Sequence, residues 1–152
     1  MAEPASTAAP MVPLQPGIFV DDASGVPRLA GTRCRTCGTY YFPRRQVCAQ
    51  CLGTDTETVP LSERGVLYTY TVVYQSTPEF RTPYLLGYVD LPEGVRVLAP
   101  LADLAVDDVR AGMPLRLVVE PVRTDAQGRV VLGYRLHRAQ PDETRPEETP
   151  PA

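Results

Sequence analysis

Four cysteines in two closely spaced pairs are the residues whose type and spacing most clearly predict chemistry. Cys34 and Cys37 have two residues between them, and Cys48 and Cys51 repeat this spacing after an interval of ten residues. Two such Cys-x-x-Cys pairs can close tetrahedrally on a metal ion, and zinc is the usual occupant of this ligand set. We therefore predict that Cys34, Cys37, Cys48 and Cys51 bind one zinc ion.

The expected role of this metal is structural. Four thiolates complete the coordination shell, so no position remains for a substrate or an attacking water molecule. The ion also contributes folding free energy to a segment that has little apolar core of its own. An iron site of the rubredoxin type uses the same ligands and stays open as an alternative. A redox disulfide is disfavoured, because two matched pairs within a short segment indicate one shared ion.

Few other residues have the pattern of a catalytic set. His137 is the single histidine, and it falls in an alternating strand pattern, where we expect it to line the sheet rather than act as a base. No serine occupies a nucleophile-elbow motif, and no cysteine remains outside the two pairs. We assign no catalytic residue and expect a non-catalytic subunit. An independent small enzyme is the less favoured alternative.

The charge balance argues against general nucleic-acid binding. The chain of 152 residues has a formal net charge of −3, and its 15 basic residues are all arginines. Residues 139–152 carry four acidic side chains against Arg145, so the rest of the chain is balanced. A nucleic-acid-binding domain normally shows a basic surplus. Exposed aromatic rings on a small barrel can still stack bases, so a single-stranded nucleic-acid-binding OB-fold protein stays as the alternative function.

The expected location is the cytoplasm. No apolar stretch is long enough to cross a bilayer. Met1–Pro13 lacks the basic and apolar regions of a secretory signal. Thiols stay reduced in the cytoplasm, where paired cysteines favour a metal over a disulfide.

The elements that must position these residues are almost all strands. The strongest pattern starts at Gly65, with the even-numbered residues from Val66 to Tyr74 on one face. Pro92–Gly94 predicts a hairpin turn, and Asp107–Ala111 a helical turn. Five strands with one break between the third and fourth predict a Greek-key barrel of the OB type, although periodicity alone leaves other small barrels open. These strands are Gly65–Tyr74, Tyr84–Leu91, Val95–Leu101, Leu115–Val122 and Val130–Arg138.

Four segments divide the chain. Residues 1–28 are rich in proline, alanine, serine and threonine and are expected to be extended or partly disordered. Residues 29–58 form the zinc ribbon and residues 59–140 the OB-fold domain. Residues 141–152 read as a disordered acidic tail rich in proline.

Together, the cysteine and strand motifs resemble the zinc-ribbon plus OB-fold family of acyl-CoA-associated accessory proteins. The resemblance covers residues 29–138. It rests on the segments Arg33–Gly38, Tyr41–Arg44, Cys48–Cys51, Gly65–Val73, Pro83–Tyr84 and Gly87–Asp90.

This resemblance implies a mainly β fold, with a rubredoxin-like zinc ribbon followed by a five-stranded OB-fold barrel. It also implies a non-catalytic accessory subunit that docks on a thiolase-fold enzyme acting on a CoA thioester, in a hetero-oligomer. Family members partner thiolases, thiolase-like acyltransferases, steroid side-chain aldolases or hot-dog-fold hydratases, and the resemblance implies that the barrel contributes to acyl-CoA binding or shapes a channel shared with the partner. Many members have a helix with a Phe-Trp pair before the ribbon. This chain has no tryptophan, which favours the thiolase or aldolase branch.

Aromatic residues and one arginine are the remaining candidates for contacts. The segment Gln75–Pro83 joins the first two barrel strands, and loops at a barrel mouth often carry function. We predict that Phe80 and Arg81 contact CoA or the partner; a stiff solvated loop is the alternative. Most strand tyrosines are expected in the core or in a partner interface. These are Tyr68, Tyr70, Tyr74, Tyr84, Tyr88 and Tyr134.

Overall fold

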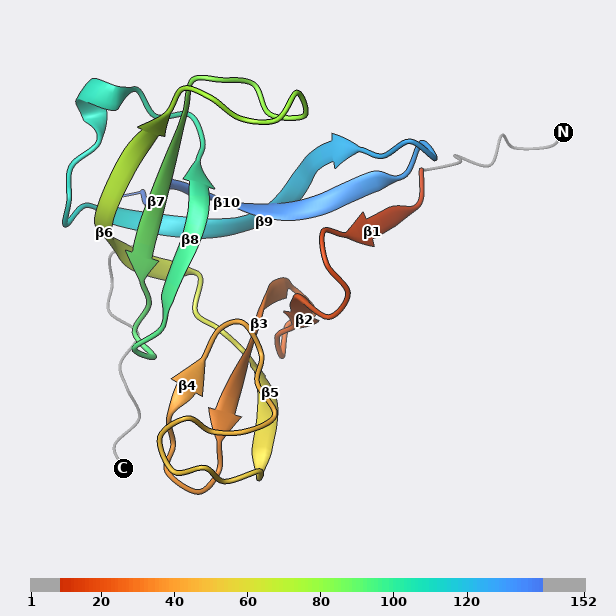
Figure 1. Ribbon diagram of the computed structural model, residues 1–152, viewed down its shortest axis with the longest axis vertical. Helices are drawn as coiled ribbons and strands as arrows, with labels where there is room; N and C mark the ends of the chain where they lie inside the picture. Colours follow the sequence, from red (N-terminus) through yellow and green to blue (C-terminus); the bar gives the residue numbers. More distant parts are fainter. Residues whose placement is uncertain (1–8, 141–152) are drawn as a thin grey trace, which may run out of the picture.

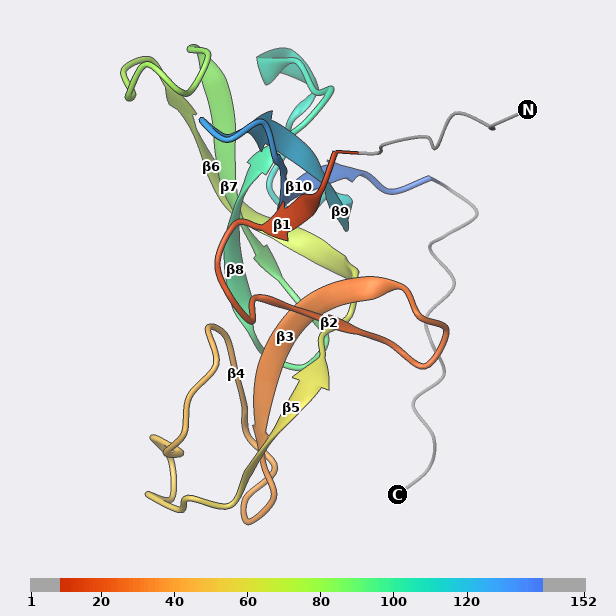
Figure 2. The same cartoon turned by 90° about the vertical axis from the view of Figure 1, so that its right-hand side faces the viewer.

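Strands make up nearly all the regular structure of the computed structural model, which describes residues 9–140. One sheet closes into a barrel, and a smaller sheet forms a ribbon that lies beside one end of it (Figures 1 and 2). Within the described residues, no helix is long and apolar enough to span a membrane. The predicted fold class, a ribbon followed by a five-stranded OB barrel, is confirmed.

The barrel closes because its first strand pairs at both edges. β6 pairs with β7 and β9, β7 pairs with β8, and β10 joins β9 to β8. The β8–β10 pairing is parallel and the other four are antiparallel. The chain therefore reverses order between β8 and β9, where the sequence predicted a break. The strands are β6 (Arg64–Val73), β7 (Tyr84–Asp90), β8 (Arg96–Leu101), β9 (Pro114–Thr124) and β10 (Val130–Arg138).

A single 3-10 turn, η1 (Val106–Asp108), lies in the connection between β8 and β9. The sequence placed a helical turn slightly later, at Asp107–Ala111. Gly112 then adopts a φ of 88°, a left-handed conformation that glycine accepts without a steric penalty. The chain can therefore turn directly into β9.

The barrel core is built in rows across neighbouring strands. Leu67 is opposite Val89 in the β6–β7 register, and Val89 is opposite Val97 in the β7–β8 register. All three are fully buried, as are Leu115 of β9 and Leu136 of β10. Burial of each such side chain contributes about 1.5–3 kcal/mol. The period-2 pattern read from the sequence thus positions the core.

A bulge interrupts the predicted alternation in β6. The register with β7 shifts between Leu67 and Thr69, so Tyr68 has no opposite residue. Before the bulge Leu67 faces the core, and beyond it Val72 packs against the core. The expectation that all even-numbered residues of this strand share one face is therefore wrong. A bulge of this kind reverses which face each later side chain takes.

The segment before the ribbon contributes a strand to each sheet. β1 (Met11–Pro13) runs parallel to β10, and β2 (Phe19–Asp21) runs antiparallel to β3 (Pro27–Cys34). β3 also pairs with β4 (Tyr40–Tyr41) and β5 (Thr56–Pro60) to form the ribbon. The predicted tail at residues 141–152 and the first eight residues lie outside the described part.

Ribbon and barrel share apolar and charged contacts. Leu29 and Leu61, at the barrel end of the ribbon sheet, belong to the same buried cluster as the barrel core. Arg28 of β3 forms an ion pair with Glu63, which also lies 3.4 Å from Nε of Arg116 on β9. These contacts fix the ribbon against one end of the barrel.

Candidate metal centre and barrel cleft

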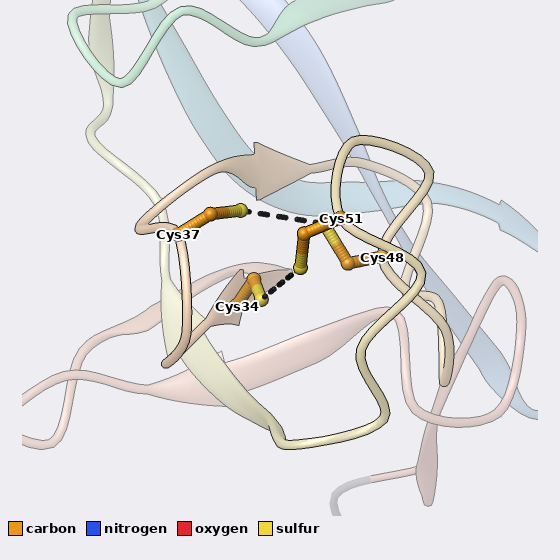
Figure 3. Close-up of side chains that lie close together, drawn as sticks. All are labelled: Cys34, Cys37, Cys48 and Cys51. Carbon is orange, nitrogen blue, oxygen red and sulfur yellow. Dashed lines mark hydrogen bonds between the residues drawn. The ribbon is translucent and has the colours of Figure 1, made fainter.

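Two short turns of similar geometry present the four cysteines. In the first turn the Gly38 amide donates to the Cys34 carbonyl at 2.8 Å, and in the second the Leu52 amide donates to the Cys48 carbonyl at 2.9 Å. The residue after each second cysteine has a positive φ, 77° for Gly38 and 60° for Leu52. We call these the first and second knuckle, Cys34–Gly38 and Cys48–Leu52. Their side chains converge on one point between the two turns (Figure 3).

The four sulfurs fit a tetrahedral zinc ion. All four Sγ atoms lie within 4.8 Å of one another. Cys34 Sγ is 3.6 Å from Cys51 Sγ, and Cys37 Sγ is 3.5 Å from Cys48 Sγ. Zinc–sulfur bonds of about 2.3 Å in a tetrahedron require sulfur–sulfur separations of about 3.8 Å. No cysteine is in a disulfide. The predicted ligand set is thus brought together, with no open coordination position.

Hydrogen bonds prepare these sulfurs to act as thiolates. The hydroxyl of Tyr41 lies 3.3 Å from Cys48 Sγ and accepts a hydrogen bond from the Gln50 amide at 3.1 Å. Its own proton is therefore free to point at the sulfur, which lowers the pKa of Cys48 to about 6. The backbone amide of Cys37 lowers the pKa of Cys34 in the same way. Thiolates are the form that binds zinc.

The pKa of Cys51 is shifted upward, opposite to that of Cys48. The Gly53 amide lowers its pKa, but hydrogen bonds with the Cys34, Cys48 and Cys37 sulfurs, together with burial, raise it to about 12. Without an ion, a proton on this sulfur satisfies its crowded neighbours. A divalent cation offsets the same charge more strongly, so zinc binding releases a proton here.

A cleft at the side of the barrel contains both residues predicted to contact CoA or a partner. Its volume is about 730 Å³. Phe80 and Arg81 come from the β6–β7 loop, and Tyr84 at the start of β7 lies 6.0 Å from Phe80 between ring centroids. The other lining residues are Leu14, Glu79, Leu86, Pro100, Leu101, Ala102, Val122, Arg123, Gly133, Tyr134 and Arg135.

Three arginines and Glu79 line this mainly apolar cleft, and the ion pairs of the arginines differ. Arg123 binds Glu79 at 3.2 Å, and Arg135 lies 3.6 Å from Glu120. Arg81 is exposed and forms no ion pair among residues 9–140. Its guanidinium is therefore the one of the three that remains available for an external anion.

His137 is placed among carboxylates rather than beside a nucleophile. Its Nε2 lies 3.0 Å from Glu120 Oε2, and its Nδ1 lies 3.7 Å from Asp103 Oδ2. Within the described residues, no serine, threonine or cysteine side chain hydrogen-bonds to it. The structure thus brings together no nucleophile and base around this histidine.

The strand tyrosines divide between two environments. Tyr84 and Tyr134 are half-buried, whereas Tyr68, Tyr74 and Tyr88 are exposed. These three and the exposed Tyr70 lie outside the core, so for them a partner interface is the part of the expectation that stays a prediction. No local feature of the sequence signals the bulge at Tyr68, after which the later side chains of β6 change face.

Comparison with known proteins reproduces both halves of this architecture. Residues 22–57 match the family model described as ChsH2, rubredoxin-like zinc ribbon domain, and residues 58–120 match that described as ChsH2, C-terminal OB-fold domain. A benzoylsuccinyl-CoA thiolase subunit BbsA from Thauera aromatica is 36% identical over 124 residues, covering 81% of this chain and 85% of that one. A DUF35 domain-containing scaffold protein from Methanocaldococcus jannaschii is 36% identical over 112 residues, covering 71% and 79%.

A solved structure agrees with these relatives. The Ltp2–ChsH2(DUF35) aldolase aligns with a TM-score of 0.62 and 29% identity, over 73% of this chain and 84% of that chain. Fold and metal centre together define a zinc-ribbon plus OB-fold protein. The chain belongs to the DUF35 family, with a ChsH2-type ribbon and barrel, which confirms the family resemblance.

Proposed function

We propose that this protein is a non-catalytic accessory subunit of an acyl-CoA-processing complex and docks on a thiolase-fold enzyme. The partner is a thiolase or a retro-aldolase that makes or breaks a carbon–carbon bond at a CoA thioester. Zinc holds the ribbon in shape, and the barrel presents a docking surface. The partner supplies the nucleophile or base.

One observation carries this proposal. The arrangement of ribbon and barrel over most of the chain is shared with a thiolase subunit and with a protein of an aldolase complex. The chain's own chemistry agrees, because its cysteines are gathered at a closed metal centre and its histidine is held by Glu120. Zinc in such a site supplies folding energy, not an activated water molecule.

Co-purification from the native host tests the proposal. The tagged full-length chain is expected to bring down, in stoichiometric amount, a larger protein whose sequence is thiolase-like. Recovery of the chain alone at native abundance would contradict the accessory role. A Cys48→Ser chain with the same tag is purified in parallel. A partner captured by the wild type but not by Cys48→Ser attributes the capture to the folded ribbon, and a partner captured by both attributes it to the rest of the chain or to the tag.

We further propose that the barrel cleft contributes to acyl-CoA binding in the assembled complex. Its apolar wall suits an acyl or pantetheine chain, since ligand pockets are mostly apolar with a few placed polar groups. Arg81 lines this cleft and forms no ion pair among residues 9–140, and a guanidinium binds phosphate through two parallel hydrogen bonds. Phe80 adds an aromatic face beside it.

Alanine substitution tests the cleft directly. Arg81→Ala is expected to weaken CoA binding to the complex about 10-fold, a loss typical of one charged hydrogen bond. Arg110→Ala is the matched control, because Arg110 is exposed but does not line the cleft. Equal CoA affinities for both variants and the wild type, measured by calorimetry, would favour a stiff solvated loop.

Binding of single-stranded nucleic acid is the alternative, and the exposed tyrosines of β6 and β7 are the feature that favours it. One of these rings, Tyr68, is not free to stack on a base. Arg96 lies 3.4 Å over the centroid of the Tyr68 ring and also pairs with Asp90 at 2.6 Å. Strong, salt-sensitive retention on single-stranded DNA would support this alternative over the subunit role.

We also propose a cytoplasmic location. The four cysteines, none of which is in a disulfide, fit it.

A further inference from the structure

The two knuckles have the same backbone turn but different residues at the left-handed position. Gly38 follows Cys37 with a φ of 77°, and Leu52 follows Cys51 with a φ of 60°. The left-handed region is unfavourable for a residue with a Cβ atom and costs glycine almost nothing. A glycine at position 52 would therefore make the second knuckle more stable than leucine does.

The leucine gains nothing inside the chain that would offset this cost. Leu52 is 77% exposed, the highest value among the exposed large hydrophobic residues in the described part of the chain. Val47, at the entrance to the same knuckle, is 48% exposed. The Cys48 amide donates to the Gly53 carbonyl at 2.9 Å, so the residues flanking Val47 and Leu52 are tied together. Both apolar side chains therefore project from one closed turn.

Positive charge accompanies this apolar tip. Arg44 and Arg45 precede Val47, and both are exposed. Arg44 donates to the Thr58 hydroxyl at 3.3 Å, and Arg45 lies over the Tyr41 ring at 5.4 Å. Neither forms an ion pair among residues 9–140, in contrast to Arg35, which pairs with Glu57 at 3.3 Å. Arg45 is next to the second knuckle, because the hydroxyl of the Tyr41 ring beneath it lies 3.3 Å from Cys48 Sγ, whereas the Arg44 guanidinium is held at Thr58 of β5. The two apolar side chains thus stand beside one cation, Arg45, that no carboxylate of the described residues neutralises.

We propose that the ribbon binds its catalytic partner through the second knuckle. Leu52 and Val47 enter an apolar depression on that protein, and a carboxylate at the rim of the depression faces Arg45. The charge of the tip argues for this occupant, because a second copy of this chain would bring the same uncompensated arginine against it. This inference rests on the proposed function and adds to it the residues that make the contact.

The test uses the full-length chain and the thiolase-like subunit that co-purifies with it, prepared separately and recombined. Leu52→Gly keeps the left-handed turn and removes the side chain, and Leu52→Asn keeps a residue that tolerates this turn but makes it polar. Both variants are expected to weaken binding to the partner about 10- to 100-fold by interferometry, as loss of a buried leucine anchor predicts. Val106→Ser is the control, since Val106 is 49% exposed on η1 and lies outside the ribbon.

Zinc content and melting temperature are measured on the same samples. Leu52→Gly is expected to bind one equivalent of metal and to melt at the same or a higher temperature than the wild type. If the wild type binds the partner and both Leu52 variants bind it equally tightly, the knuckle contact is overturned and the subunit role is left intact. Failure of the wild type to bind any thiolase-like subunit overturns both. Concentration-dependent dimerisation that Leu52→Gly abolishes would assign the knuckle to self-association instead.

Discussion

Phe42 of the ribbon meets Tyr134 of β10 edge to face, with their ring centroids 6.3 Å apart and their planes at 88°. Phe19 of β2 approaches the same tyrosine from another direction, at 6.4 Å. Tyr134 also lines the barrel cleft. The metal-bound ribbon is therefore in direct contact with a wall of the proposed ligand site.

Removal of Phe42 should loosen this junction. Phe42→Ala loses an aromatic pair and part of a buried ring, so we expect the free energy of unfolding to fall by about 1–3 kcal/mol. Urea denaturation followed by circular dichroism measures this difference. Tyr74→Ala serves as the control, because Tyr74 is 72% exposed and its loss should cost less than about 0.5 kcal/mol. Equal midpoints for the two variants would show that the junction contributes little.

Metal removal should unfold the ribbon before the barrel. The ribbon strands have few buried apolar residues of their own, whereas the barrel has a continuous core. We expect one zinc per chain by elemental analysis, loss of that zinc in Cys48→Ser, and faster proteolysis between β3 and β5 than within β6–β10. Iron in place of zinc would support the rubredoxin-type alternative. A chain that holds neither metal and resists proteolysis would contradict the structural role.

Gly87 should not tolerate even one added carbon atom. A Cβ atom at this position of β7 would lie 2.8 Å from Leu101 Cδ1 and 2.9 Å from Leu67 Cδ1. Gly87→Ala is therefore expected to destabilise the barrel by about 1–3 kcal/mol through overpacking. The matched change Gly94→Ala meets no atom within 4 Å and tests instead the left-handed turn at a φ of 82°. A melting temperature of Gly87→Ala equal to that of the wild type would refute the close contact.

Acidification should weaken the turn before β3. The Val26 amide is the main cause that lowers the pKa of Asp22, followed by the Arg28 guanidinium, whose Nε donates to it at 2.9 Å. A lowered folded-state pKa means that the charged carboxylate stabilises the fold above its unfolded pKa. That stability is lost as the pH falls through the lower, folded value. The difference in unfolding free energy between the wild type and Asp22→Asn should therefore shrink with acidification; a difference that grows would contradict this assignment.

Local patterns in the sequence sufficed where a feature depends on neighbours in the chain. The cysteine spacing predicted the four ligands because each knuckle is a single turn. Pro92–Gly94 predicted the hairpin between β7 and β8 for the same reason. The offset of Leu52 from Cys51, identical to that of Gly38 from Cys37, was a readable signal of a left-handed leucine that motif reasoning overlooked.

Features that depend on distant segments could not be read in this way. The register shift at Tyr68 is decided by how β6 meets β7, so periodicity within β6 alone missed it. Residues 1–28 were expected to be extended or partly disordered, and the pairing of β1 with β10 was not predicted because its partners, Val130–Leu132, lie more than a hundred positions away. The contact of Tyr134 with Phe19 and Phe42 could not be predicted either, because these residues come from distant parts of the chain.

The leading segment gives the two halves of the molecule a second connection. The chain passes between ribbon and barrel once from β1 to β2 and again from β5 to β6 (Figure 2). Two tethers resist rotation of one half about the other, which a single linker would permit. A protein that binds the second knuckle would therefore also set the direction in which the barrel cleft faces.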